Sequence, residues 1–514
     1  MRFVQHRLAG ILLLLVFLTG GCAGPRPGTG ADPSRSRQML IVLDGLRPDY
    51  VTPQLMPALS ALGQRGVVMT RHHAVFPTVT RVNAASIATG AYPEAHGLLG
   101  NAVFFPAVDP ARFFTTADRD NLLRVEAAGL PLLTVPTLPE VLEAAGHRLL
   151  VASAGSSGSA YLLNHTGSAG ATLHYAFGRP ETLYAEALDH LGAVPDADTP
   201  NHARNRWIVD ALLDVGLPAV DPAVTVLWLS DPDTTAHAHG IGHPLTVEAL
   251  FRLDAEIDRL LSRLDDAGLL ESTNIWVTSD HGFSEHTGGV DLTAVLAPFA
   301  DVLDDGAPRV VALDGAIYVR DNDQETIAAI VAALQAAEGV GAVFTEGATA
   351  GATEGSVPGT LSFDLARWGH ERSAQILYSA DWSNDVGAYG YLGTTAHDGV
   401  AGHGSASPFD IQNTLVAAGP DLKAGVRIAT PTGNVDLAPT FLHLLGVDVP
   451  PTMQGRVLRD ALRDDAGGDP VSAETTEVTV QSADGSYTLT AVLSVADGRT
   501  YLDYTTVERR ESQR

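Results

Sequence analysis

Several short apolar runs in this chain are each followed by an aspartate, and this pattern constrains the fold more than any other feature. The runs and the acids that follow them are 39–43 with Asp44, 224–229 with Asp233, and 275–278 with Asp280 and His281. Apolar runs of this length predict buried strands, and the helical spacing of leucines over 248–267 predicts a helix between two of them. Strands that alternate with helices form a largely parallel sheet with helices on both faces. We therefore predict an α/β fold with a mostly parallel central sheet.

The chain of 514 residues is long enough for one large α/β domain with insertions. Gly-rich stretches interrupt the alternation in the middle of the chain, and a period-2 pattern typical of strands begins after residue 464. Residues 101–135 show no regular pattern and are expected to form a loop region near the site. The predicted units are a signal peptide at 1–21, a flexible linker at 22–37, a catalytic domain at 38–464 with an inserted subdomain at 284–400, and a C-terminal β extension at 465–514.

The N-terminus has the features of an export sequence. Arg2 and Arg7 precede an apolar stretch over 8–18, which is short for a membrane span. The stretch ends in small residues and Cys22, which resembles the lipobox of bacterial lipoproteins, and Cys22 is the only cysteine in the chain. We therefore expect an exported lipoprotein, anchored through a lipid on Cys22 to a membrane on its periplasmic or extracellular side. The alternative is an ordinary cleaved signal peptide.

The charge balance limits the possible partners. The formal net charge is −28, from 32 basic and 60 acidic residues. Such a surface repels nucleic acid polymers and anionic membranes, so a role in binding DNA or RNA is disfavoured. We expect a small-molecule substrate, and contact with a membrane only through the lipid anchor.

The residues at the strand ends have the chemistry of metal ligands. In a parallel sheet the carboxyl ends of the strands lie at one edge, where ligand sites form. Asp233 and His237 are four residues apart, which places both on one side of a helical turn. Carboxylate and imidazole together suit Zn²⁺ or a similar divalent ion. A single aspartate after a strand is more often a helix cap, so the prediction depends on several strand ends that offer the same chemistry.

Thr80 precedes a predicted helix at 82–88 that ends at Gly90. A threonine hydroxyl is a weak nucleophile, but a bound metal lowers its pKa and the amides at a helix N-terminus attract phosphate. Taken alone, Thr80 would be read as an N-cap.

A set of motifs connects these residues to a known family. Their positions are 42–48, 76–83, 89–97 with Asn101, 232–237, 279–282, 402–404 and 434–440. In this order and spacing they resemble the nucleotide pyrophosphatase/phosphodiesterase (type I phosphodiesterase) family of the alkaline phosphatase superfamily. The resemblance extends from about residue 38 to about residue 460.

The resemblance implies an alkaline phosphatase-like fold with two Zn²⁺ ions, although other divalent transition metals also accept these ligand types. One ion would be held by Asp44, Thr80, Asp280 and His281, and the second by Asp233, His237 and His403. The Asn101 side chain and a backbone amide near Thr80 would bind a phosphoryl oxygen. Thr80 would attack phosphorus, and water would release the resulting phosphothreonine.

The chain also departs from the family pattern. Many nucleotide-processing members have an aromatic residue directly after the nucleophile, whereas this chain has Arg81. Arg81 suggests an anionic or polar group on the substrate, and an arginine that pairs with a surface acid is an equal alternative. Residues 153–159 lack the cation expected of a dedicated monoesterase. A typical sulfatase is disfavoured because threonine cannot become formylglycine.

These observations favour a two-metal hydrolase of phosphate diesters or pyrophosphates. A phosphomonoester or phosphonate hydrolase with the same metals is the first alternative. An inactive cell-surface binding module that keeps the fold is a remote one, because it would have no reason to retain every ligand. Other histidines are not assigned as ligands: His72, His73, His239, His243, His286 and His397.

Overall fold

The computed structural model describes residues 36–109, 112–303, 306–313, 315–463 and 471–510. The predicted signal peptide, Cys22 and nearly all of the linker lie outside these residues. Among the described helices, none combines the length and the apolar character that a membrane span requires.

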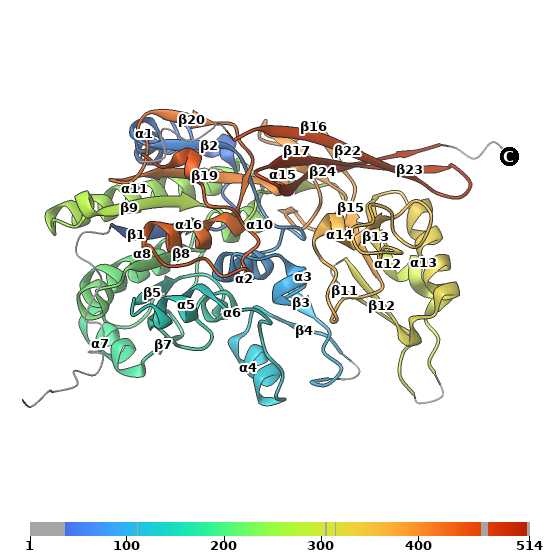
Figure 1. Ribbon diagram of the computed structural model, residues 1–514, viewed down its shortest axis with the longest axis horizontal. Helices are drawn as coiled ribbons and strands as arrows, with labels where there is room; N and C mark the ends of the chain where they lie inside the picture. Colours follow the sequence, from blue (N-terminus) through green and yellow to red (C-terminus); the bar gives the residue numbers. More distant parts are fainter. Residues whose placement is uncertain (1–35, 110–111, 304–305, 314, 464–470, 511–514) are drawn as a thin grey trace, which may run out of the picture.

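The centre of the molecule is a sheet of ten strands, which confirms the predicted α/β class (Figure 1). The strand order is β20 (Val426–Ile428), β2 (Val67–His73), β19 (Gln412–Ala418), β9 (Thr273–Thr278), β1 (Arg37–Leu43), β8 (Val224–Leu229), β5 (Leu149–Ser153), β6 (Gly170–His174) and β7 (Phe177–Arg179), with β21 (Thr432–Gly433) beside β2. Strands β1, β8, β9, β5 and β6 are mutually parallel, whereas β19 and β7 run antiparallel to their neighbours.

Helices cover both faces of this sheet because its central strands are apolar on both sides. Alternate residues of β1 point to opposite faces, so Leu40 and Val42 join one core and Ile41 and Leu43 join the other. The first face is covered by α2 (Thr80–Thr89), α4 (Arg119–Ala127), α5 (Leu138–Ala144), α6 (Ser157–Leu162) and α16 (Leu437–Leu444). The second is covered by α1 (Pro57–Arg65), α7 (Glu181–Leu191), α8 (His202–Asp210), α10 (Asp233–His239) and α11 (Pro244–Asp266).

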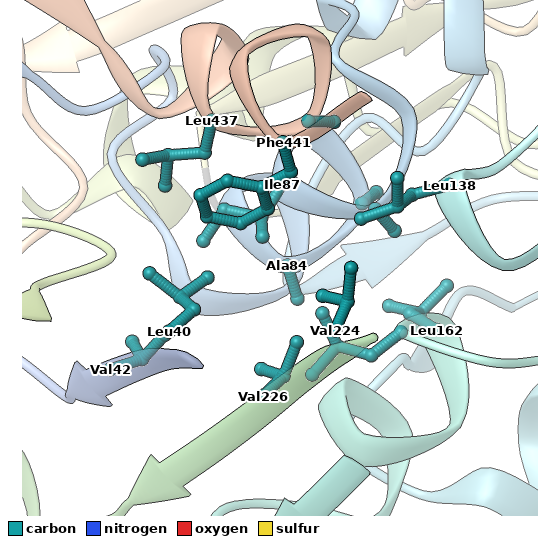
Figure 2. Close-up of a cluster of buried hydrophobic side chains, with 14 of the residues drawn as sticks. Leu40, Val42, Ala84, Ile87, Leu138, Leu162, Val224, Val226, Leu437 and Phe441 are labelled. Carbon is teal, nitrogen blue, oxygen red and sulfur yellow. The ribbon is translucent and has the colours of Figure 1, made fainter. Parts of the chain in front are cut away.

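Helix α2 lies in the middle of the first core. Figure 2 shows Ala84 and Ile87 of α2 between the side chains of the sheet and Leu437 and Phe441 of α16. The helix is buried along almost its whole length and ends at Gly90, whose φ of 61° suits a left-handed C-cap. Packing on both sides therefore fixes the position of its first residue, Thr80.

The segment predicted as an inserted subdomain at 284–400 forms two further sheets, one of them completed by β18 just beyond it, and its boundaries stay predictions. One sheet has the order β16 (Trp382–Val386), β17 (Leu392–Thr395), β10 (Ser284–His286) and β18 (Ala401–Gly402). The other has the order β11 (Val310–Leu313), β12 (Ala316–Val319), β15 (Ile376–Ala380), β13 (Val340–Thr345) and β14 (Leu361–Ser362). The remaining helices are α3 (Pro93–His96), α9 (Leu217–Val220), α12 (Leu292–Leu296), α13 (Gln324–Ala336), α14 (Phe363–Ala366) and α15 (Pro408–Ile411).

Residues 101–135 are more regular than the sequence pattern suggested. They contain the short strand pair β3 (Ala102–Val103) and β4 (Phe114–Thr115), followed by α4. The prediction of a loop region was wrong for α4, because its low overall hydrophobicity hid the two residues that it buries, Leu122 and Val125.

The period-2 segments at the C-terminus form a three-stranded antiparallel sheet of β22 (Ala473–Gln481), β23 (Tyr487–Ala496) and β24 (Arg499–Arg509). This sheet packs against the rest of the molecule through β24 (Figure 1). The Tyr501 hydroxyl donates to Asp436 Oδ2 at 3.0 Å, and the Thr505 amide donates to the carbonyl of Ala406 at 3.0 Å. Asp503 Oδ1 lies 2.6 Å from Nε2 of His73, and both side chains are buried.

The buried contact between His73 and Asp503 gives a prediction about stability. Burial alone would raise the pKa of Asp503, but His73, the Ser494 hydrogen bond and the Arg71 charge together outweigh it, so the folded-state pKa lies below its usual value. The stabilisation is therefore present above the unfolded-state pKa and is lost as the pH falls through the folded-state pKa. At neutral pH, Asp503→Asn should lower the free energy of unfolding by about 1–3 kcal/mol, since it removes the carboxylate that bonds to buried His73 and pairs with Arg71.

Urea unfolding of both proteins at several pH values measures this effect. Asp497→Asn, at the exposed turn between β23 and β24, is the control and should unfold like the wild type. Equal losses in the two variants, or a difference that persists unchanged into strong acid, would contradict the ion pair's role.

Candidate active site

The ends of three neighbouring strands bring three carboxylates to one edge of the sheet. Asp44 follows β1, Asp233 begins α10 after β8, and Asp280 follows β9. The backbone ties two of these turns together, because the Asp233 amide donates to the Asp44 carbonyl at 3.0 Å. The Gly45 amide donates to Asp280 Oδ1 at 3.1 Å, which ties the third. The residues that follow these strands therefore lie together at one edge of the sheet, as the sequence predicted.

The candidate nucleophile lies beside these carboxylates. Thr80 is buried at the first position of α2, and its Oγ1 lies 3.3 Å from Nε2 of His281. The Asn101 side chain reaches the same helix end, where its Oδ1 accepts a hydrogen bond from the Arg81 amide at 3.1 Å. Because Oδ1 accepts this hydrogen bond, the Nδ2 group at the other end of the Asn101 carboxamide points away from the Arg81 amide. Thr80 and Asn101 thus share the N-terminus of α2, where phosphate binding is favoured.

The histidines of the site share one orientation. Each places Nδ1 against a backbone carbonyl: His237 against Ala401 at 2.9 Å, His281 against Gly282 at 2.9 Å, and His403 against Thr78 at 2.8 Å. A carbonyl can only accept, so Nδ1 carries a hydrogen in each ring, and in the neutral form of the ring Nε2 presents its lone pair. This is the arrangement by which proteins orient a metal-binding histidine.

The Nε2 atoms face carboxylate oxygens. The Nε2 atoms of His237 and His403 lie 3.2 Å and 3.4 Å from Asp233 Oδ1. His281 Nε2 lies 3.1 Å from Asp280 Oδ2 and 3.6 Å from Asp44 Oδ1. These same three oxygens are buried and have no hydrogen-bond partner. A buried acceptor without a donor is costly, and lone pairs that face one another repel, so this donor set fits a cation bound between them.

The ligand atoms fall into two overlapping groups. One contains Asp233, His237 and His403, and the other contains Asp44, Asp233 and His281, with the ligand atoms of each group within 4.8 Å of one another. Asp233 belongs to both, so it lies between the two positions. Asp280 and Thr80 adjoin the second group through His281. Every predicted metal ligand is therefore in one place.

The electrostatics of the site differ from one carboxylate to the next. Burial raises the pKa of Asp44 well above its usual value, and the charges of Asp280 and Asp233 raise it further. At Asp233 and Asp280 the neighbouring histidines outweigh burial and hold the carboxyl pKa below its usual value, while the two carboxylates raise the pKa of His237 and His281. Burial lowers the pKa of His403 to about 4, so this ring is neutral at physiological pH and can act as a ligand. Arg81 is half-buried, and its charge opposes the upward pKa shift of Asp44, which locates the guanidinium near the site.

Two supporting residues were missed by the sequence analysis. Trp228, at the end of β8, donates from Nε1 to Asp44 Oδ2 at 2.9 Å. Asn434 donates from Nδ2 to the Asp280 carbonyl at 2.9 Å and to Asn83 Oδ1 of α2 at 3.0 Å. A buried tryptophan in an apolar run gives no sign of its polar contact. Asn434 stood in a motif that carried the resemblance, but its role depends on contacts between distant segments.

The unassigned histidines lie outside the two ligand groups. His72 contacts Thr432 and Asn434, and His73 pairs with Asp503. The rings of His239 and His243 stack on each other 5.0 Å apart, and those of His286 and His397 lie 5.4 Å apart.

Comparisons with known proteins identify the family of the chain. The family model described as type I phosphodiesterase/nucleotide pyrophosphatase matches residues 39–406. The chain is similar to ectonucleotide pyrophosphatase/phosphodiesterase family member 1 of Rattus norvegicus, with 26% identity over 250 residues, or 48% of this chain and 24% of the relative. It is also similar to the bis(5′-adenosyl)-triphosphatase of Bos taurus, with 27% identity over 281 residues, or 53% of each chain. The chain thus spans only a quarter to a half of the length of these relatives.

Solved structures share the fold. Murine ectonucleotide pyrophosphatase/phosphodiesterase 5 superposes with a TM-score of 0.60 at 19% identity, over 83% of this chain and all of that one. An inactive variant of the same murine protein, in complex with AMP, superposes with a TM-score of 0.59 at 19% identity over the same shares of the two chains.

The contact between Trp228 and Asp44 can be tested. Trp228→Phe keeps an aromatic ring but removes the donor that orients Asp44, and loss of such a supporting hydrogen bond lowers metal affinity about 10- to 100-fold. Competition titration of zinc against a chelator measures the affinity.

Trp276→Phe is the matched control. Trp276 is buried in the neighbouring strand β9, and its Nε1 donates to Gln38 at 3.0 Å, at the start of β1 and away from Asp44. Zinc affinity should be unchanged in this control, and equal losses in the two variants would show that the effect is one of packing.

Proposed function

Because the chain belongs to the type I phosphodiesterase/nucleotide pyrophosphatase family, we propose that it is a metal-dependent hydrolase of phosphate diesters or pyrophosphates. The observation that carries the proposal is the set of unpartnered oxygens of Asp44, Asp233 and Asp280 that face histidine lone pairs beside Thr80. Cations fit there, and a hydroxyl at a helix N-terminus lies next to them. This combination suits nucleophilic attack on a phosphoryl group.

The donor set suits two Zn²⁺ ions. One would be held by Asp44, Thr80, Asp280 and His281, and the other by Asp233, His237 and His403. When bound, such ions supply Lewis acidity and lower the pKa of hydroxyl and water ligands. Manganese or iron is compatible with the same ligand types.

The chain's own residues account for the covalent chemistry. Thr80 Oγ1 forms a bond to phosphorus while the bond from phosphorus to the leaving oxygen breaks. The Thr80 proton passes to water, and the leaving oxygen takes a proton from water. In the second step a water oxygen bonds to phosphorus, the bond to Thr80 breaks, and Thr80 regains its proton. The α2 amides and the Asn101 Nδ2 group hold phosphoryl oxygens during both steps.

Arg81 supports a second candidate, a phosphomonoester or phosphonate hydrolase. Its guanidinium acts on the pKa values of Asp44 and His237, so it is close enough to the site to pair with an additional anionic group on a substrate. Nucleotide esters belong among the substrates to be tested, since a similar solved structure is a complex with AMP. An inactive binding module remains the third and most distant candidate.

The substrate class and the nucleophile can be tested together. We expect zinc-loaded protein to hydrolyse bis-p-nitrophenyl phosphate faster than p-nitrophenyl phosphate. Thr80→Val should reduce turnover by at least about 1,000-fold because the variant keeps the side-chain shape but lacks the nucleophile. Mass spectrometry of acid-quenched wild type should find phosphate on Thr80.

Thr80→Ser is the matched control, because it restores a hydroxyl at the same position and should recover part of the activity. A preference for the monoester would move the assignment to the second candidate. Equal activity of wild type and Thr80→Val would exclude Thr80 as the nucleophile, and no turnover of either ester would favour the binding module.

We also propose that the protein is exported and anchored to a membrane through lipid on Cys22. The support is the apolar stretch before Cys22 and the absence of any other cysteine from the sequence. Cells that express the protein should incorporate labelled palmitate into the wild type and not into Cys22→Ser. The wild type should sediment with membranes, whereas the variant should be soluble. Membrane association of the unlabelled variant would contradict a lipid anchor.

A further inference from the structure

A partly exposed, largely aromatic surface lies beside the candidate active site. We name it the aromatic ledge, and it consists of the half-buried His239 and His243 and the exposed Tyr389 and Val400. The rings of His239 and His243 stack at 5.0 Å, and the Tyr389 ring meets His243 edge-on at 5.4 Å. Tyr389 and Val400 are each 46% exposed. The tip of the β16–β17 hairpin therefore lies over the turn that follows α10.

Exposed apolar side chains gather near this ledge. Among the described residues, the exposed large hydrophobic side chains are Phe113, Phe251, Val302, Val386, Tyr389, Leu392 and Val400. The last four of these fall within residues 386–400. Single exposed apolar residues are ordinary, but a concentration of them beside a site marks a binding surface.

The ledge is continuous with the site. Thr80, His281, His403 and His237 form a row, in which the His281 and His403 rings stack at 3.4 Å and the His403 and His237 rings lie 5.2 Å apart. His237 is 44% exposed at the far end of this row from Thr80. The ledge begins there, because Val400 directly precedes Ala401, whose carbonyl accepts from His237 Nδ1.

We propose that the aromatic ledge binds the leaving alcohol of the substrate and selects for an apolar, uncharged one. This inference rests on the proposed function. In an in-line displacement the leaving oxygen departs opposite the attacking oxygen, and so on the side away from Thr80. His237 lies on the side away from Thr80, and the ledge lies beyond His237. The flat rings of His243 and Tyr389 suit an aryl or alkyl group.

The charges around the ledge argue against an anionic leaving group. The ledge itself contains no lysine or arginine, and the Glu285 carboxylate reaches its edge, where it accepts from the Ala388 amide at 3.1 Å. The Arg47 guanidinium lies 5.8 Å from the Tyr391 ring, but it is buried and paired with Asp49 at 2.7 Å. A pyrophosphate or nucleotide leaving group on the ledge would therefore meet the Glu285 carboxylate and no cation of the ledge itself. The ledge thus favours simple diesters over pyrophosphates.

The double variant Tyr389→Ser/Val400→Ser tests this inference with zinc-loaded protein. The substrates are methyl esters of phosphate that release p-nitrophenol, the larger methylumbelliferone, or a carboxylated nitrophenol. Wild type should prefer the two uncharged leaving groups. The variant should lose about tenfold in kcat/KM for the umbelliferyl ester, which corresponds to 1.4 kcal/mol of lost apolar contact. Its kcat/KM for the carboxylated ester should change less than twofold.

Two further measurements separate the ledge from general damage. Hydrolysis of the phosphothreonine follows release of the alcohol, so its rate should be the same in wild type and variant. Methylumbelliferone alone should bind the wild type more tightly than the variant, as measured by its fluorescence. Val302→Ser is the matched control, because Val302 is 67% exposed outside the ledge, and its substrate preference should equal that of the wild type.

Each contrary outcome has a distinct meaning. If the double variant lost kcat/KM equally for all three esters, or for none, the proposed role of the ledge would be wrong while the proposed function stayed in place. A wild-type preference for the carboxylated ester would also overturn it. Failure of zinc-loaded wild type to cleave any ester would overturn the proposed function, and this inference with it.

Discussion

Three carboxylates, of which Asp44 and Asp280 are buried and Asp233 is half-buried, meet at the ends of β1, β8 and β9, and holding these like charges together is the constraint on which the rest of the structure depends. The oxygens of Asp44, Asp233 and Asp280 that face the histidines have no hydrogen-bond partner. Carboxylates are buried at such close range only where something compensates their charge. The fold provides the frame through parallel strands, which end at one edge, and through backbone carbonyls that fix each histidine ring. Positive charge between the ligands would then stabilise both the fold and the site.

Much of this frame follows from local sequence. The apolar run before Asp44 predicts a buried strand because it is short and continuous, and in the structure its two faces fill two cores. Asp233 and His237 were placed together by helical spacing alone. The antiparallel direction of β19 could not be predicted, because an apolar strand buried on both sides has the same pattern in either direction. Helix α4 was missed because it buries only Leu122 and Val125.

The parts of the site that escaped prediction are those built from distant segments. Trp228 and Asn434 act through single hydrogen bonds to Asp44 and to the Asp280 carbonyl. Nothing in the neighbouring sequence of either residue identifies its partner. The same is true of the aromatic ledge, which unites the turn after α10 with a hairpin some 150 residues later in the chain. The ligands at the edge of the sheet can therefore be predicted from motifs. The residues that hold those ligands, and the surface beside them, can be identified only from the three-dimensional structure.

The docking of β24 has a consequence for the order in which the molecule matures. Thr505 holds the backbone of Ala406, three residues after His403, and Asp503 holds His73 in the strand that leads to Thr80. Tyr501 reaches Asp436, next to the segment that carries Asn434. Ribosomes make β24 after every residue of the candidate site. A chain that has not yet reached β24, or that is cut before it, could assemble the central sheet and still lack the contacts that settle the catalytic edge, so hydrolytic competence would arise only after β24 has docked.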